Sequence, residues 1–344
     1  MELVIFHVGG GDDDIGPARA IMKILGPIVR LVLFDARPGS TEVSVESIKT
    51  KSGVKTDLVT IGIDEDYGRK PFYVNKFPLS SSLLPSSPLT KDEDPNYPHC
   101  RTWGENTELK SEIDVITDSI DSLVKSGRIP APDFLSIDAQ GAELRILRGA
   151  RNALQSSILG LVTECEFFEI YAGQGLIQDQ LIELSTHGFR LTEIYSEQRW
   201  FPGPAAGKGF LTMGESLFLK YALIDRGTDE HLRGCIEISK LQPIQIFKLA
   251  LISFAFERTS YFFTLMRYLS KHHKDVITQF SEIPDVSSIF KTYSSMMNDY
   301  PKFLADRKYF LKHPPYFKLS SSRMLNVTLL DIARKLKRVV TSST

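Results

Sequence analysis

The sequence predicts an α/β protein with a mostly parallel sheet flanked by helices, followed by a helical C-terminal region. Residues Phe134–Ile137 are a short, continuously apolar run, as expected of a strand buried in a parallel sheet. The run ends at Asp138, a polar turn through Gly141 follows, and residues from Glu143 onward have the apolar spacing of a helix. An acid is thereby predicted at the carboxyl end of a strand, directly before a crossover helix, where open α/β sheets bind ligands.

The N-terminal residues show the same arrangement. Residues Leu3–Val8 form an apolar strand, residues 15–25 have helical spacing, and residues 29–34 form a second apolar strand that ends in Asp35. The turn after the first strand contains three successive glycines, Gly9, Gly10 and Gly11. Strand, glycine turn, helix, strand and acid are the first half of a nucleotide-binding α/β fold.

The glycine turn predicts a site at which the main chain comes close to a ligand, because no Cβ intervenes. Asp35 lies 24 positions after Gly11, near the interval of about 20 residues at which an acid meets ribose hydroxyls. Residues 12–14 are all aspartate, which disfavours a pyrophosphate at this helix start. A tight turn followed by a helix cap is the alternative interpretation of residues 9–14.

The rest of the first two thirds of the chain continues the α/β pattern. Strands are predicted over residues 57–63, 72–75, 114–117, 158–165, 189–195 and 216–221, the last two as an antiparallel pair. A helix is predicted over residues 176–187, with Gly188 at its end. Helices are also expected over residues 241–270, 285–297 and 323–339.

Charge divides the chain into two regions. The net charge is −1, but residues 1–224 carry 22 Lys+Arg against 31 Asp+Glu, whereas residues 225–344 carry 19 against 11. We therefore expect a ligand-binding domain over residues 1–224 and a helical accessory region over residues 225–344.

Composition excludes several other classes of protein. Cys100, Cys165 and Cys235 have no Cys-x-x-Cys spacing, so neither a disulfide framework nor a zinc site is predicted, and no metal is expected. No basic segment precedes the first apolar run and no later run is long enough to span a bilayer, so a cytoplasmic protein is expected. The basic C-terminal helix has no interleaved aromatic residues, so no nucleic-acid partner is expected. The oligomeric state is not predicted.

The stretch "DFLSIDAQGAELRILRGA", residues 133–150, resembles the signature of the FkbM family of methyltransferases. The likeness extends from about Val4 to Tyr221. It implies the class I methyltransferase fold, a Rossmann-like sheet, with S-adenosyl-L-methionine as the cofactor. Family resemblance further implies transfer of a methyl group to a hydroxyl of a glycan or secondary metabolite, so the expected partner is a small-molecule or glycan acceptor. A cofactor with a sulfonium, an ammonium and no phosphate also suits the acidic glycine loop.

The resemblance implies roles for particular residues. The expected cofactor-binding residues are Gly9, Gly10, Gly11, Asp35 and Asp64, the last beside the adenine. Residues expected near the ligand or acceptor are Ser81, Ser82, Gln140, Glu143 and Glu164. For Asp64 a solvated acidic loop, and for Glu164 a structural salt bridge, are the alternatives. The chain departs from the family at two positions: His7 stands where an acid is usual, and Ser136 replaces the usual lysine.

Asp138 is the expected catalytic residue. A carboxylate at this strand end can accept the proton of a hydroxyl or position the acceptor. The alternative is that Asp138 caps the following helix, since aspartate is a favoured N-cap.

Two rival functions from other classes remain. A non-catalytic cofactor-binding or interaction protein on the same fold is compatible with Ser136 and His7. An NAD-dependent oxidoreductase would share the first strands and Asp35, but the acidic glycine loop and the stretch 133–150 disfavour it.

Overall fold

The computed structural model describes residues 1–9, 16–36, 53–91, 103–200, 210–224 and 234–280, with residues 283, 286, 287 and 289. Residues Met1–Ile289 form one compact unit; the second unit, Phe290–Thr344, lies outside the described residues. The helices were predicted over residues 285–297 and 323–339, and apart from residues 286, 287 and 289 these ranges also lie outside the described residues.

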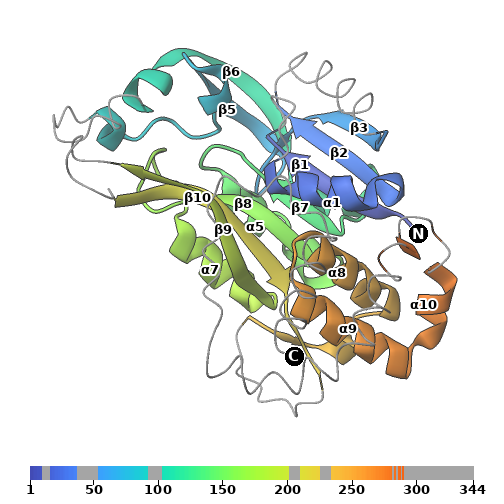
Figure 1. The fold of residues 1–344 in the computed structure, drawn as a ribbon. Coiled ribbons are helices and arrows are strands. Elements are labelled where there is room, and N and C mark those ends of the chain that lie inside the picture. The colour runs from blue at the N-terminus through green and yellow to red at the C-terminus, as the bar shows by residue number, and fades with distance from the viewer. Residues whose placement is uncertain are drawn as a thin grey trace. The chain divides into compact units, whose positions relative to one another are not determined.

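A seven-stranded sheet with the order β3-β2-β1-β7-β8-β10-β9 forms the centre of the described unit (Figure 1). Its strands are β1 (Leu3–Val8), β2 (Val29–Asp35), β3 (Lys55–Thr60), β7 (Phe134–Ile137), β8 (Gly160–Glu166), β9 (Phe189–Trp200) and β10 (Phe210–Lys220). β10 is antiparallel to both β8 and β9, whereas the other neighbouring strands are parallel. The mostly parallel sheet predicted from the sequence is confirmed.

The strand order reverses at β1, which lies between β2 and β7. The chain runs outward from β1 to β2 and β3, and then returns to the other side of β1 through β7 and β8. Crossovers that leave in opposite directions open a crevice beyond the carboxyl ends of the two central strands. The fold therefore directs attention to the residues that follow Val8 and Ile137.

Helices cover both faces of this sheet. They are α1 (Arg19–Leu25), α4 (Ile120–Lys125), α5 (Glu143–Arg148), α6 (Arg151–Ser156), α7 (Ile177–Thr186), α8 (Pro243–Ala255), α9 (Thr259–His272) and α10 (Lys274–Phe280). On one face Val4, Phe6 and Val8 of β1 share a buried core with Ile146 and Leu147 of α5. On the other face, Phe134 of β7 stacks on Phe256, which follows α8, with ring centroids 5.5 Å apart. Because both faces are buried, the central strands β1 and β7 are apolar except for His7 and Ser136.

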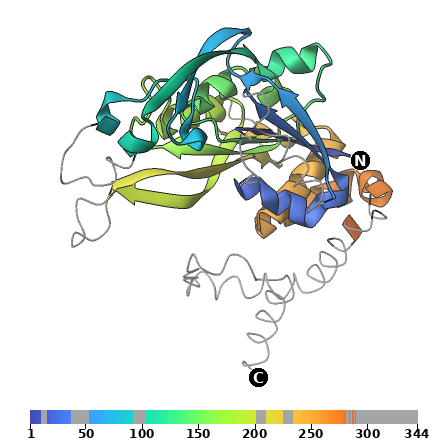
Figure 2. The same ribbon diagram turned by 90° about the horizontal axis from the view of Figure 1, so that it is seen from above.

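One predicted strand is divided in the structure. Residues 57–63 were expected to form a single strand, but β3 ends at Thr60 and β4 (Gly62–Ile63) belongs to a second sheet. This sheet has the order β4-β6-β5, with β5 (Gly68–Asn75) and β6 (Leu109–Asp118), drawn in blue to teal in Figure 2. The prediction of one continuous strand is wrong because the chain changes sheets at Ile61. The two-residue strands β11 (Ala222–Leu223) and β12 (Ile236–Glu237) pair in parallel.

The helices after residue 234 are attached to the sheet by buried polar contacts. Lys248 of α8 donates to both carboxylate oxygens of Asp133, at 2.8 Å each, and Asp133 also accepts the main-chain N–H of Val4. Tyr261 of α9 donates its hydroxyl proton to the carbonyl of Lys220 at 2.8 Å. These helices thus share a compact unit with the sheet, and the boundary expected near residue 224 stays a prediction. In the described part of the chain, no helix has the length and apolar character to cross a membrane.

Candidate active site at the carboxyl edge of the sheet

The main chains of β1 and β7 come into close contact where these two strands end. Gly9 donates its N–H to the carbonyl of Phe34 at 3.2 Å, and Asp138 donates its N–H to the carbonyl of Val8 at 2.9 Å. Gly9 has φ +103°, and a Cβ built on it would lie 1.6 Å from the carbonyl oxygen of Asp138. Glycine is therefore required here to let Asp138 approach, a reason that the sequence did not give. Gly10 and Gly11 lie outside the described residues.

Asp138 is exposed at this edge and does not cap the helix after it. The residue that precedes α5 is Ala142, and no side chain caps the helix there. The Oδ1 atom of Asp138 accepts a hydrogen bond from the side-chain amide of Gln140 at 2.7 Å. The capping interpretation is thus not supported, and the carboxylate is directed by a side chain of its own loop.

Gln140 links four parts of the site. Its Nε2 donates to Asp138 and also to Glu164 Oε2 at 3.1 Å, while its Oε1 accepts the Tyr171 hydroxyl proton at 2.9 Å. Its main-chain carbonyl accepts the Ser82 hydroxyl at 2.6 Å. Gln140 has φ +53°, a left-handed conformation that is uncommon outside glycine and clusters at functional sites. The amide therefore holds the carboxylates of Asp138 and Glu164 side by side.

The two serines predicted near the ligand have different surroundings. Ser82 is joined to the site through Gln140, as described above. Ser81 is also buried, but its hydroxyl accepts the main-chain N–H of Asn75 at 3.1 Å, within the small sheet region. Tyr171, which sequence reasoning missed, packs on Gly141: a Cβ at Gly141 would come 2.8 Å from its ring. No local signal marked Tyr171, because the contacts that bring it to the site, with Ser80, Gln140 and Gly141, join residues distant in sequence.

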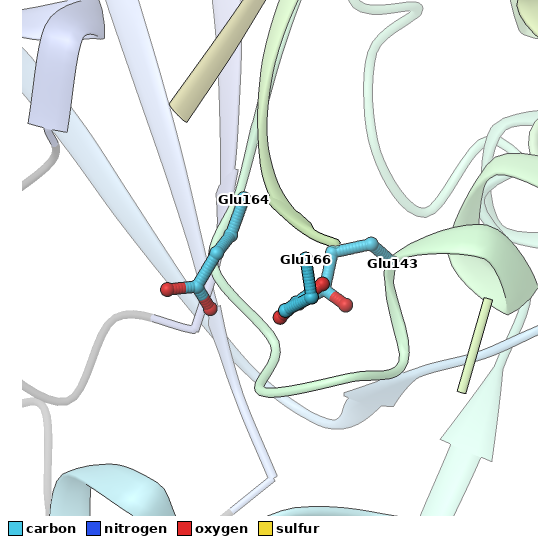
Figure 3. Close-up of side chains that lie close together, drawn as sticks. All are labelled: Glu143, Glu164 and Glu166. Carbon is cyan, nitrogen blue, oxygen red and sulfur yellow. The ribbon is translucent and has the colours of Figure 1, made fainter. Parts of the chain in front are cut away.

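Three glutamates lie close together, as Figure 3 shows: Glu143 at the start of α5, and Glu164 and Glu166 on β8. Burial, assisted by the charge of Asp138, raises the pKa of Glu143 to about 7. Burial and the neighbouring acids raise the pKa of Glu164 and of Glu166 well above the usual range. Glu164 and Glu166 are two apart on a strand and so share a face, a signal that could have joined Glu166 to the predicted site. The salt-bridge alternative for Glu164 finds no partner among the described residues, since its charged neighbours are acids.

Asp35 and Asp64, both predicted to bind the cofactor, lie in different settings. Asp35 ends β2, beside the Phe34 carbonyl that accepts the Gly9 N–H, so it belongs to the carboxyl edge. Asp64 is fully buried and ion-paired with Lys70 at 2.7 Å and with Arg145 of α5. Its other oxygen accepts the N–H of Glu65 at 2.8 Å. A solvated loop is therefore the wrong description of Asp64; its contacts fix the loop after β4 to α5, and its place beside the adenine stays a prediction.

The two departures from the family pattern lie opposite each other. His7 of β1 is the register partner of Ser136 of β7, and His7 Nδ1 lies 3.0 Å from Ser136 Oγ. Both side chains are buried. An acid and a lysine at these positions would form a buried ion pair, and this chain has a hydrogen-bonded His7–Ser136 pair instead. The two replacements therefore contact each other.

The strand order, with an antiparallel β10 between β8 and β9, and the glycine turn and acids at the carboxyl edge define a Rossmann-like methyltransferase fold. A family model described as the methyltransferase FkbM domain matches residues 26–191.

Two known proteins are similar to parts of the chain. A stretch of 64 residues is 39% identical to the hexuronic acid methyltransferase AglP of Haloferax volcanii, covering 19% of this chain and 24% of that protein. The crystal structure of methyltransferase FkbM from Methylobacillus flagellatus has 12% sequence identity and a TM-score of 0.36, over 62% of this chain and 43% of that one. The chain thus spans about a quarter of the curated relative's length.

Proposed function

We propose that this protein is an S-adenosylmethionine-dependent methyltransferase that methylates a hydroxyl of a glycan or secondary metabolite. The observation that carries the proposal is the carboxyl edge itself. Gly9 and Asp138 directly follow β1 and β7 there, and Asp35 ends β2; these three strands are neighbours and parallel. The name of the relative that acts on hexuronic acid supports a sugar acid as the first acceptor to try.

The charge of the edge suits this cofactor. Asp35 and Asp138 lie at the carboxyl ends of β2 and β7, the two strands that flank β1, and the charged groups that act on Glu164 of β8 are acids. A negative edge attracts a sulfonium and an ammonium and repels a pyrophosphate. This preference argues against the NAD-dependent alternative on grounds of electrostatics.

Each residue has a part in the proposed transfer. S-adenosylmethionine, when bound, supplies a methyl group on a positively charged sulfur. Gly9 lets the ends of β1 and β7 come together, and the methionine portion is expected beside this contact, while Asp35 accepts hydrogen bonds from the ribose hydroxyls. Asp138 accepts the acceptor's hydroxyl proton while the oxygen bonds to the methyl carbon and the carbon–sulfur bond breaks. The products are a methyl ether and S-adenosylhomocysteine. Alignment of the reacting atoms can lower the barrier by about 7–11 kcal/mol.

Two measurements test the proposal. Mass spectrometry of ligands that copurify with the protein is expected to find S-adenosylmethionine or S-adenosylhomocysteine, whereas a dinucleotide would support the oxidoreductase. Transfer of labelled methyl is then measured to oligosaccharides with hexuronic acid and to matched neutral oligosaccharides. Binding of the cofactor with no transfer to any hydroxyl would support the non-catalytic alternative. The cytoplasmic location stays a prediction from the sequence.

A further inference from the structure

The three neighbouring glutamates form a compact all-oxygen cluster. One carboxylate oxygen each from Glu143, Glu164 and Glu166 lies within 4.8 Å of the others. The residues come from two elements, the first turn of α5 and the carboxyl end of β8, so the cluster depends on the tertiary fold (Figure 3).

Two oxygens of the cluster are buried with no hydrogen-bond partner. Glu143 Oε1 accepts the N–H groups of Ala139 at 2.9 Å and Gly141 at 3.2 Å, which fixes the carboxylate. Its other oxygen, Oε2, is buried and unpartnered, and so is Oε2 of Glu166. The two side chains are 0% and 1% exposed. A buried acceptor without a partner is costly, so these oxygens point to a missing ligand.

No cation of the described residues balances the cluster. The charged groups that act on Glu166 are Glu143 and Asp138, and those that act on Glu164 include Glu215 as well. Like charges at this separation in a buried site repel strongly. A proton shared by two carboxyl groups would relieve the repulsion within one pair only. A metal ion can be coordinated by one oxygen from each of the three carboxylates.

We propose that Glu143, Glu164 and Glu166 bind one hard divalent cation, of the Mg²⁺, Mn²⁺ or Ca²⁺ kind. Such ions prefer carboxylate oxygens. Two ligands of one Ca²⁺ ion can be at most about 4.6–5.2 Å apart, from the usual metal–oxygen distances. The three oxygens, none more than 4.8 Å from another, are close enough together to share one such ion.

The site is accessible to solvent beside Glu164. This residue is only half-buried, whereas Glu143 and Glu166 are buried, so ions and waters would enter next to Glu164. Glu164 also shares the Gln140 amide with Asp138. A bound cation would therefore favour the ionised form of Asp138, which the proposed proton acceptance requires. Metal binding itself is independent of that function and can be measured without cofactor or acceptor.

The test uses the whole chain, freed of metal with a chelator that is then removed. Calorimetry with MgCl₂, MnCl₂ and CaCl₂ is expected to show one equivalent bound for at least one of them, and that salt is expected to raise the melting temperature. Glu166→Gln keeps the side chain's size and removes its charge, and is expected to weaken binding at least tenfold. Glu193→Gln is the matched control, because Glu193 pairs with Arg258 at a partly exposed site; it is expected to bind metal as the wild type does.

The variant also reports on its own folding. Removing one of several buried like charges should leave the metal-free melting temperature of Glu166→Gln equal to or above that of the wild type. If Glu166→Gln nevertheless fails to fold, Glu164→Gln, on the accessible side, takes its place. Absence of binding to wild type at millimolar metal overturns the proposal, as does equal binding by the glutamate variants and Glu193→Gln. A higher melting temperature in Glu166→Gln with no response of wild type to metal would assign the cluster to shared protons. None of these outcomes alters the cofactor-binding test above.

Discussion

Gly9→Ala tests whether the contact between the β1 and β7 strand ends builds the cofactor site. The added Cβ would lie 1.6 Å from the Asp138 carbonyl oxygen, whereas real contacts stay above 3.0 Å, so the two main chains must separate by about 1.4 Å or more. This movement strains the bonds from Gly9 N–H to Phe34 and from Asp138 N–H to Val8, at 3.2 and 2.9 Å. Each is worth about 0.5–1.5 kcal/mol net, and the positive φ adds about 1–2 kcal/mol. We expect the free energy of unfolding to fall by about 2–5 kcal/mol.

A matched control separates the effect of backbone strain from that of the steric overlap between the added Cβ and Asp138. Gly127 also has a positive φ, +72°, but a Cβ there would meet nothing within 4 Å. Gly127→Ala should therefore lose only the strain of about 1–2 kcal/mol and bind cofactor normally. Urea unfolding measures the free energies, and calorimetry with S-adenosylhomocysteine measures affinity, which should fall more than tenfold in Gly9→Ala. If Gly9→Ala loses no more stability than Gly127→Ala and binds with wild-type affinity, the reasoning is wrong.

Asp138→Asn keeps the oxygen that accepts the hydrogen bond of the Gln140 amide, so a normal melting temperature and normal cofactor affinity are expected. The rate of methyl transfer is expected to fall by a factor of about 10²–10⁴, and transfer at the wild-type rate would remove Asp138 from the site. Asp35→Ala removes charge-assisted hydrogen bonds worth about 1.5–3 kcal/mol each and should weaken cofactor binding at least tenfold, so unchanged calorimetric affinity in a folded protein would refute its placement on the ribose. His7→Asp and Ser136→Lys should each cost about 3–5 kcal/mol by burying an unpaired charge, and the double variant should recover most of it; additive losses would contradict the pairing. Burial lowers the pKa of Lys220 to about 8, whereas the unfolded chain keeps its proton to about 10.4. Between these two pH values the unfolded state binds more protons than the folded state, so the free energy of unfolding should rise as the pH increases from about 8 to 10.4 and fall as the pH is lowered again. This dependence on pH should be steeper in the wild type than in Lys220→Met. Parallel stability curves for the two proteins would show an ordinary Lys220 pKa.

The amino-acid sequence by itself determined the elements whose signal is local. The strands Leu3–Val8 and Phe134–Ile137 are continuous apolar runs, and both are confirmed as strands buried in full. The helix over residues 176–187 and its terminal Gly188, with φ +80°, are also confirmed. The positions of Asp138 and Asp35 at strand ends followed from these runs, since a strand's end can be read from where its apolar residues stop. Burial on both faces and the preference of glycine for positive φ act within a few residues, so the sequence records them.

Only the tertiary structure decided which residues meet across the chain. His7 and Ser136 are 129 positions apart and touch because β1 and β7 pair in one particular register. Glu143 meets Glu164 and Glu166 because α5 starts where β8 ends, and no pattern within either segment predicts that they meet. The change of sheet after Thr60 was equally hidden, since both halves of residues 57–63 have strand composition. Such contacts depend on sheet order and register, which are set by the packing of the whole unit and not by the period of any one segment.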